Sequence, residues 1–170
     1  KDLISRKARF LSIAGGAYPD GPPQFNIKTD IAAARKLFAE WPTPIVASGE
    51  EIGSSLLFPA ASIEKDFAWT PAHPVVDAYR AYKPMPYDAP TCAMAALLYA
   101  IRPQEGYFKL SEPGTISVLD DGRTKFTPSP EGKHRYLIPD PEQKERVIKT
   151  YTEIASAKPA PRQPRRRQQQ

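Results

Sequence analysis

The chain has 170 residues, 41% of them hydrophobic and 10% aromatic, so it is long enough and apolar enough to bury one globular core. Its longest apolar run covers residues 93–101, far fewer than the roughly 20 residues that a membrane-spanning helix needs. Cys92 is the only cysteine, which excludes a disulfide scaffold and, with only two histidines, leaves too few ligands for a zinc site.

The net charge of +5 comes from the C-terminal end of the chain. Residues 158–170 hold five basic side chains and no acidic one, so residues 1–157 carry nineteen of each sign. A neutral body argues against a nucleic-acid-binding face on the fold. We expect residues 1–157 to form the domain and residues 158–170, rich in Pro, Arg and Gln, to be a basic disordered tail. Within this tail, Arg165–Arg167 could bind phosphate groups of a nucleic acid or an acidic partner, and a solvated tail without a partner is the alternative.

The N-terminal third predicts a strand–helix–strand unit. Residues 8–13 are a short apolar run typical of a buried strand. Thr29 or Asp30 can cap a helix that runs to about residue 41, and residues 44–48 predict the next strand. Because such crossovers are right-handed, the two strands are expected to lie parallel in one sheet that helices cover.

The middle of the chain predicts helices separated by prolines. Residues 51–58 fit a short helix, and residues 59–71 fit an irregular or partly helical connection. Apolar spacing predicts a helix over 73–82. Residues 91–101 predict a strong helix that is apolar almost all round, and such a helix is expected to be central.

Beyond residue 103 the hydrophobic period changes to two, which predicts a small β-hairpin region with its turn at 120–123. A last helix follows, with Asp140 as N-cap, Pro141 at its first position and Gln143 completing a capping-box-like pair. Together the elements predict an α/β fold, an open, mainly parallel sheet flanked by helices. The strands expected in the hairpin region cover 107–110, 115–119, 124–127 and 134–138.

Several residues that could carry chemistry have a simpler structural explanation. Cys92 lies inside the apolar helix, where an inert buried thiol is expected. Asp120-Asp121 fits the tip of a hairpin better than a pair of catalytic carboxylates. His73 and His134 have no partner close to them in the sequence, and Gly15-Gly16 lacks the later glycine of a phosphate-binding loop.

The one constellation that points to function is the loop over residues 15–26. It follows the carboxyl end of the first predicted strand, and open α/β sheets bind small ligands at that edge. Polar side chains on such a loop are held in place by the rigid elements on both sides. The residues alone therefore predict a polar small-molecule pocket.

Residues 13–17 (IAGGA) and 23–35 (PQFNIKTDIAAAR) resemble motifs that read MGGA, AEFN and DPEAA in nucleoside hydrolases. Residues 73–79, 106–114 and 132–137 are similar to a bacterial-type branch of the same family. The resemblance spans about residues 8–157. It implies the C-terminal half of the inosine/uridine-preferring nucleoside hydrolase fold.

The resemblance also implies a chemistry. The family hydrolyses the N-glycosidic bond of ribonucleosides, with a calcium ion that binds a water and the ribose diol and an aspartate that deprotonates the water. The ligand expected is a ribonucleoside or ribose. Gln24 stands at the family's glutamate and Asn26 matches its asparagine, so both are expected to be ribose-binding-like residues, while Tyr18 stands at about the place of an earlier asparagine.

The chain departs from the family where the metal is bound. It has no cluster of the form D-x-D-x-x-x-D-D, and Ala93 stands where a later aspartate is expected. Alanine cannot ligate calcium, which needs six to eight oxygen ligands. The comparison of motifs therefore assigns this chain no catalytic residue, no metal ligand and no cofactor of its own.

Two hypotheses remain open. The chain begins at Lys1 without methionine or a signal-peptide core, so it is expected to be processed or truncated, and an active enzyme would be completed by a missing N-terminal half on another chain or in a longer protein. Alternatively, it is a non-catalytic binding or structural subunit that uses a degenerate fold. In both cases we expect no catalysis by this chain alone, and a homo-oligomer or a complementary chain that covers strand edges and the 91–101 helix. The sequence assigns no compartment.

Overall fold

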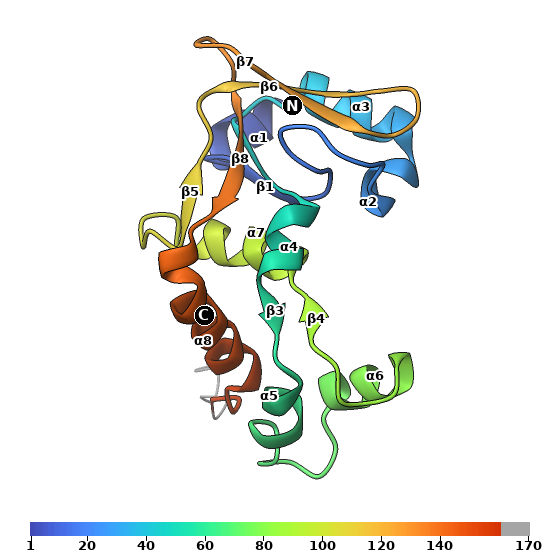
Figure 1. Ribbon diagram of the computed structural model, residues 1–170. Helices are drawn as coiled ribbons and strands as arrows, with labels where there is room; N and C mark the ends of the chain where they lie inside the picture. Colours follow the sequence, from blue (N-terminus) through green and yellow to red (C-terminus); the bar gives the residue numbers. More distant parts are fainter. Residues whose placement is uncertain (161–170) are drawn as a thin grey trace, which may run out of the picture.

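The computed structural model describes residues 1–160, so residues 161–170 of the predicted tail, Arg165–Arg167 included, lie outside the described residues. The chain forms an α/β fold on a six-stranded mixed sheet in the order β1-β2-β8-β6-β7, with β5 paired to β8 (Figure 1). The strands are β1 (Leu11–Ala14), β2 (Ile45–Ser48), β5 (Phe108–Leu110), β6 (Gly114–Val118), β7 (Thr124–Pro128) and β8 (His134–Pro139).

The expected α/β fold class is confirmed, although the sheet is mixed rather than mainly parallel. Only β1, β2 and β8 run parallel to one another. β5 and β6 pair antiparallel with β8, and β7 pairs antiparallel with β6. The strand directions follow from the lengths of the connections between strands. A tight turn can join only antiparallel neighbours, whereas parallel neighbours need a crossover such as α3 (Ile31–Glu40).

Strand β2 lies between two hydrophobic clusters, and all four of its residues are buried. Val46 packs on one face with residues of α4 (Glu50–Ser55), α7 (Cys92–Ile101) and α8 (Lys144–Ser156). Ile45 and Ala47 point to the other face, against Phe38 of α3 and Ile116 of β6. The alternation of side chains along a strand therefore divides the core into two layers.

The remaining elements lie outside the six-stranded sheet. Among them, β3 pairs antiparallel with β4 in a separate two-stranded sheet. No helix within residues 1–160 is long and apolar enough to cross a membrane. These elements are α1 (Asp2–Lys7), α2 (Phe25–Lys28), β3 (Leu57–Phe58), α5 (Ala60–Lys65), α6 (Pro74–Tyr82), β4 (Ala89–Pro90) and the 3-10 turn Pro141–Gln143.

The structure confirms the helices predicted over 30–41, 73–82 and 91–101, and it corrects details elsewhere. Helix α1 was not predicted, and the segment 51–58 is divided between α4 and β3. Asp140 is confirmed as a cap, since its side chain accepts a hydrogen bond from the Glu142 N–H at 3.3 Å. Gln143 does not close the capping box, because its Oε1 accepts from Arg146.

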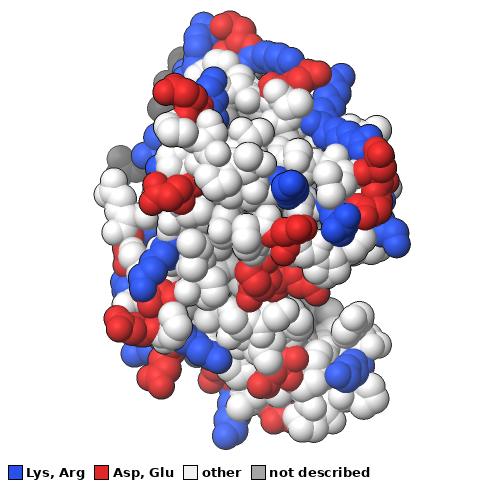
Figure 2. All heavy atoms as spheres, turned by 45° about the horizontal axis from the view of Figure 1, so that its top comes forward, with Lys and Arg blue, Asp and Glu red and all other residues white. Residues whose placement is uncertain are grey.

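Helix α7 is central on one side only. Ala95 and Leu98 are buried in the first cluster, whereas Leu97 is 61% and Ile101 56% exposed. The helix is therefore central, as expected, through one face, while its other apolar face is open to solvent. Charged side chains of both signs are mixed over the surface seen in Figure 2.

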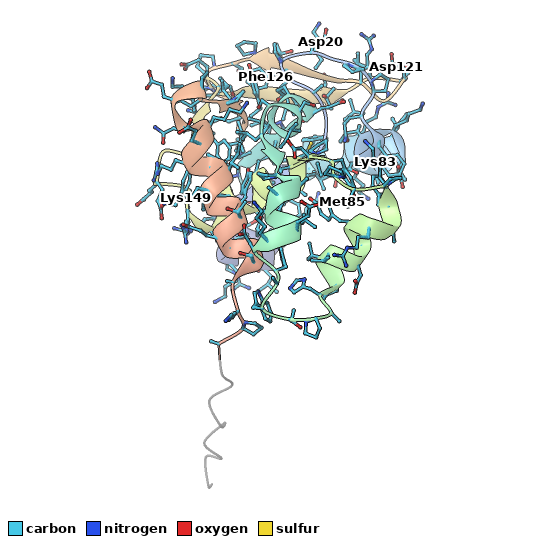
Figure 3. The ribbon with its side chains drawn as sticks, turned by 60° about the horizontal axis from the view of Figure 1, so that its bottom comes forward. Asp20, Lys83, Met85, Asp121, Phe126 and Lys149 are labelled. Carbon is cyan, nitrogen blue, oxygen red and sulfur yellow. The ribbon has the colours of Figure 1, made fainter. Side chains whose placement is uncertain are left out.

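The loop that follows β1 is fastened to the β6–β7 hairpin. The buried Thr124 hydroxyl accepts a hydrogen bond from the Ala17 N–H and donates one to the Ala17 carbonyl, both at 3.0 Å. The Phe126 N–H donates to the Pro19 carbonyl at 2.8 Å, and the backbones of Asp20 and Lys125 form an isolated antiparallel β-bridge. Figure 3 shows Asp20 and Phe126 on the side of the molecule that this hairpin forms.

We expect Thr124→Val to lower the free energy of unfolding by about 2 kcal/mol, because it leaves two buried backbone groups of Ala17 without partners. Urea unfolding measures the difference. Thr127→Val on the exposed face of the same strand is the matched control, with an expected change within about 0.5 kcal/mol. Equal effects of the two substitutions would contradict the role of the Thr124 hydroxyl.

Candidate functional site

The carboxyl ends of the parallel strands β1 and β2 meet the first turn of α7, and this junction is the candidate site (Figure 1). The Ser48 hydroxyl donates to the Cys92 carbonyl at 3.1 Å, which fixes the start of α7 against the end of β2. The Glu50 N–H donates to the Gly16 carbonyl at 2.9 Å. The segments that follow both strands and the segment that begins α7 therefore share one edge of the sheet.

Tyr18 belongs to the core. It is 6% exposed, its hydroxyl donates to the Gly15 carbonyl at 3.1 Å, and its ring stacks on Tyr136 with the centroids 5.3 Å apart. Burial raises the pKa of its phenol above the ordinary value. Gly16 has a φ of +85°, and a Cβ there would lie 2.6 Å from the Tyr18 hydroxyl oxygen, so this packing requires glycine. At the place of the family's asparagine the chain therefore offers a ligand no free polar group.

Gln24 and Asn26 lie together at the start of α2 and fix the loop against β1. The Gln24 Oε1 accepts a hydrogen bond from the Asn26 N–H at 2.9 Å, and the Asn26 Nδ2 donates to the Ala14 carbonyl at 3.1 Å. Among the described residues, the Gln24 Nε2 and the Asn26 Oδ1 have no hydrogen bond. Each amide thus has one group in the fold and one for a ligand, and their ribose-binding role stays a prediction.

Glu51 is a site residue that the sequence did not indicate. Its Oε2 accepts a hydrogen bond from the Tyr18 N–H at 3.2 Å, while its Oε1 is buried without a hydrogen-bond partner. Burial raises the pKa of this carboxyl group above 4.5. In the sequence, Glu50-Glu51 looks like an ordinary pair of solvated acids in the first turn of a helix. Only the folded structure brings Glu51 next to the Tyr18 backbone, so the sequence alone does not indicate its role.

The described residues do not fit a calcium ion. Ala93 is exposed in the first turn of α7. Within residues 1–160 no group of three or more His, Cys, Asp or Glu side chains could hold a metal ion. Calcium needs six to eight oxygen ligands, so no catalytic step of this chain can be derived through it. Burial raises the pKa of the Cys92 thiol, which makes that side chain a poor nucleophile.

The other titratable residues considered above have structural roles. Asp120 pairs with Arg35 at 2.5 Å and Asp121 with Arg123 at 2.7 Å at the hairpin tip. The His134 Nδ1 accepts a hydrogen bond from the Ile116 N–H at 2.9 Å, and His73 caps α6. Each histidine therefore has a backbone N–H as its partner. The partner of His134, Ile116, belongs to a different strand.

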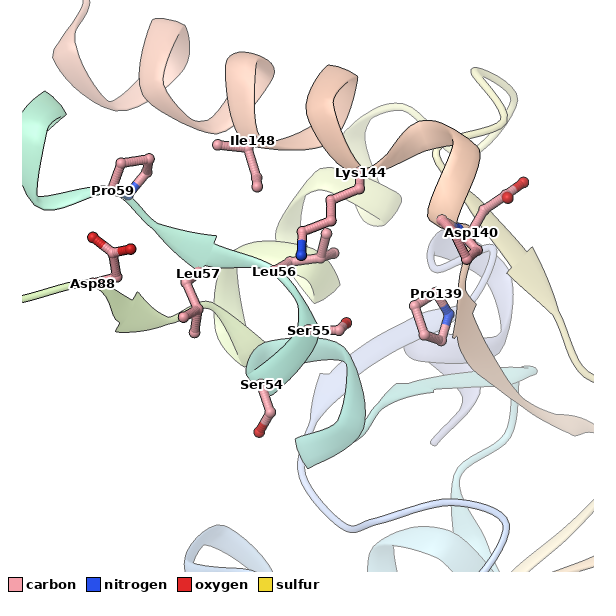
Figure 4. A pocket seen from close by; sticks show the side chains of 11 residues that line it. Ser54, Ser55, Leu56, Leu57, Pro59, Asp88, Pro139, Asp140, Lys144 and Ile148 are labelled. Atoms are coloured by element: carbon pink, nitrogen blue, oxygen red, sulfur yellow. The ribbon is translucent and has the colours of Figure 1, made fainter.

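A separate cavity of about 480 Å³ lies at the carboxyl end of β8, between α4, β3 and α8 (Figure 4). Its walls include Leu57 and Ile148, and its lining contains no residue of the 15–26 loop. Each of the two carboxylates at this cavity has a partner in the fold. Asp140 pairs with Lys109 at 3.3 Å, and Asp88 accepts the Ala60 N–H at 2.8 Å. The sugar-binding edge predicted from the sequence and this cavity are therefore different places.

The raised pKa of Glu51 predicts a pH dependence of stability. Between the unfolded and the folded pKa the folded chain binds more protons, so the free energy of unfolding from this group falls as pH rises. Glu51→Gln keeps an oxygen for the Tyr18 N–H and removes the charge. We expect it to be more stable than the parent at pH 7 and to match it below pH 4.5, in urea unfolding at both values. The exposed Glu50→Gln is the control, and a Glu51→Gln variant that is less stable at pH 7 would contradict the argument.

Comparison with known structures shows what this fold is similar to. A plant nucleoside hydrolase, the PpNRh1 enzyme, matches 93% of this chain with a TM-score of 0.66 and 18% identity. An inosine-guanosine nucleoside hydrolase matches 90% of it with a TM-score of 0.67 and 15% identity. No protein-family model and no curated protein matches the sequence.

At these identities the similarity concerns the fold. The chain covers 57% of the first enzyme and 55% of the second, so it spans a little over half the length of each. The part of the chain that the structure describes therefore has a nucleoside-hydrolase-like α/β fold.

Proposed function

We propose that the chain is a nucleoside-hydrolase-like protein that does not cleave nucleosides by itself. The observation that supports this is Ala93, exposed in the first turn of α7, where the resemblance expects an aspartate. Hydrolysis of a glycosidic bond needs an activated water and stabilisation of an oxocarbenium-like transition state. An alanine side chain can provide neither. Within the described residues, no cluster of three or more His, Cys, Asp or Glu side chains could hold a metal ion in its place.

Recognition of the sugar is the function that the loop can still perform. Ribose presents adjacent hydroxyl groups, each a donor and an acceptor. The Gln24 Nε2 can donate and the Asn26 Oδ1 can accept, and both side chains are held by their second amide group. We therefore propose that ribose or a ribonucleoside binds at this edge without being hydrolysed.

Isothermal titration tests both parts of the proposal. With the whole chain we expect no calcium binding at millimolar concentration, and weak binding of ribose or inosine that Asn26→Ala reduces at least threefold. Gln104→Ala, another exposed amide, is the control and should leave the affinity unchanged. Micromolar calcium binding that the sugar strengthens would contradict the proposal and restore the enzyme hypothesis.

An assembly role has support of its own in an apolar surface. We call it the α7–α8 face, and two of its members, Leu97 and Ile101, are more than half exposed. Strand β1, against which α7 packs, pairs only with β2 among the described strands, so its outer edge is open. An open edge beside apolar surface is a place where proteins associate. The face is lined by Met94, Leu97, Leu98, Ile101, Tyr151 and Ile154, of which Leu98 and Tyr151 are buried core residues.

We propose that a complementary polypeptide segment covers this face and adds a strand to β1. The support is the length of the similar enzymes, of which this chain spans a little over half. Parallel sheets are normally buried, and here the parallel part of the sheet ends at the open edge of β1. A second copy of this chain is the alternative occupant, and the next experiment distinguishes the two.

The double substitution Leu97→Glu, Ile101→Lys tests the face. We expect the chain without its complement to bind the dye ANS and to self-associate weakly and indefinitely in sedimentation, and the double variant to lose both properties. Because both side chains are exposed, the free energy of unfolding should change by less than about 0.5 kcal/mol. Tyr82→Glu, an exposed aromatic outside the face, is the control. A defined dimer would overturn the proposal in favour of a second copy, and a monomer without ANS binding would overturn it altogether.

A further inference from the structure

A second hollow, which we call the tyrosine groove, lies where α6 ends and β4 begins. Its volume is about 530 Å³. Figure 3 labels Lys83 beside the pale green helix α6. Neither the 15–26 loop nor the α7–α8 face contributes to it. The groove is lined by Ala78, Tyr79, Tyr82, Lys83, Tyr87, Asp88, Ala89 and Pro90.

Three tyrosine rings line the groove. Tyr79 and Tyr87 stack with their centroids 5.4 Å apart, and Tyr82 is tilted against Tyr87 at 6.4 Å. The Tyr87 hydroxyl donates to the Tyr79 carbonyl at 2.9 Å, and Tyr79 packs on the buried Phe58. Tyr82 is nevertheless 84% exposed. The tyrosine rings therefore form an aromatic surface that is fixed by contacts with the core and exposed to solvent at Tyr82.

The rim of the groove is suited to a cation. The Lys83 ammonium lies 5.2 Å from the centroid of the Tyr87 ring, so this ring already holds a positive charge over its face. Asp88 uses Oδ1 for the Ala60 N–H, and its Oδ2 has no hydrogen bond among the described residues. An arginine can stack on the ring in place of the lysine and pair with the carboxylate.

The chain contains a segment with the matching chemistry. Residues 157–170 contain Pro159, Pro161 and Pro164, together with five basic side chains and no acidic one. Pro161 and Pro164 are three residues apart in the sequence, and three residues make one turn of a polyproline II helix, so binding in that form would bring both prolines to one side. Proline-rich segments of this kind bind in aromatic-lined grooves.

The segment can reach the groove of its own chain. The Trp69 Nε1 donates to the carbonyl of Ser156, the last residue of α8, at 2.8 Å, and Trp69 also packs against His73, the N-cap of α6. Residue 157 therefore begins near one end of α6 and the groove lies at the other. A nine-residue helix is about 13 Å long. Residues 157–170 in polyproline II form span up to about 40 Å.

We propose that the tyrosine groove binds the proline- and arginine-rich segment 157–170 of this chain, with a proline on the exposed ring of Tyr82 and an arginine on the Tyr87 ring and Asp88. The inference is independent of nucleoside binding, because the groove and the 15–26 loop share no residue. It gives a role to the only strongly basic stretch of the sequence, and the nucleic acid considered for that stretch becomes a competitor in the test.

A synthetic peptide of residues 157–170, labelled with a fluorophore, tests the proposal by anisotropy. It is titrated into the whole chain carrying Pro161→Ala and Pro164→Ala, so that the chain's own segment does not compete. We expect saturable binding that Tyr82→Ala weakens at least tenfold. Phe25→Ala, which removes a ring that is 77% exposed elsewhere on the surface, should leave the affinity unchanged. The parent chain should bind the peptide several-fold more weakly than the double proline variant, because its own segment occupies the groove.

Three results would overturn the proposal. A scrambled peptide of the same composition that binds equally well would show attraction by charge alone. A Tyr82→Ala variant with unchanged affinity would place the peptide elsewhere, and because Tyr82 is exposed, its loss does not threaten folding. Preference of the peptide for a single-stranded oligonucleotide at physiological salt, with no binding to the chain, would assign the segment to nucleic acid instead.

Discussion

The burial of β2 on both faces is the constraint on which the rest of the structure depends. Its four residues are all buried, and their alternation sends Val46 into one hydrophobic cluster and Ile45 and Ala47 into the other. A strand in this position must have a neighbour on each side, which β1 and β8 provide in parallel. Their parallel direction brings the carboxyl ends of the strands to a common edge, and this edge is where a ligand site can form.

At that edge the architecture of a nucleoside-hydrolase-like fold is kept while the chemical groups differ from the family motif. Tyr18 is part of the core, and Ala93 offers only a methyl group at the start of α7. Gln24 and Asn26 remain as neutral amides that hold the loop and offer one polar group each. Positioned hydrogen-bonding groups without a metal or a base suit recognition of a sugar better than its cleavage.

The local parts of this fold could be predicted from the sequence, because they depend on neighbouring residues. The helical spacing after Asp30 and the turn at 120–123 produced α3 and the β6–β7 hairpin as expected. That the parallel strands and the hairpin strands share one sheet could not be predicted, since the pairing of β2 with β8 joins residues about ninety positions apart. The same holds for Thr124, which fastens the loop across 107 positions.

The candidate site was predicted in place but not in detail. The loop 15–26 lies at the strand end that the sequence indicated, yet the groups that fix it, Thr124 and Glu51, carry no signal in their own segments. Glu51 becomes unusual only through burial, and burial follows from the packing of α4 under the loop. Long-range packing, rather than any missing motif, set the limit of the sequence-based prediction.

Release of free base from inosine and uridine measures whether this chain alone hydrolyses nucleosides. The whole purified chain is incubated with each nucleoside and millimolar calcium, and the base is quantified by chromatography against a buffer blank. We expect no release above the blank, also for Ala93→Asp, because one added carboxylate is far short of the six to eight oxygens that calcium needs. Multiple turnovers by the parent chain that a calcium chelator abolishes would show instead that the chain is a calcium-dependent hydrolase.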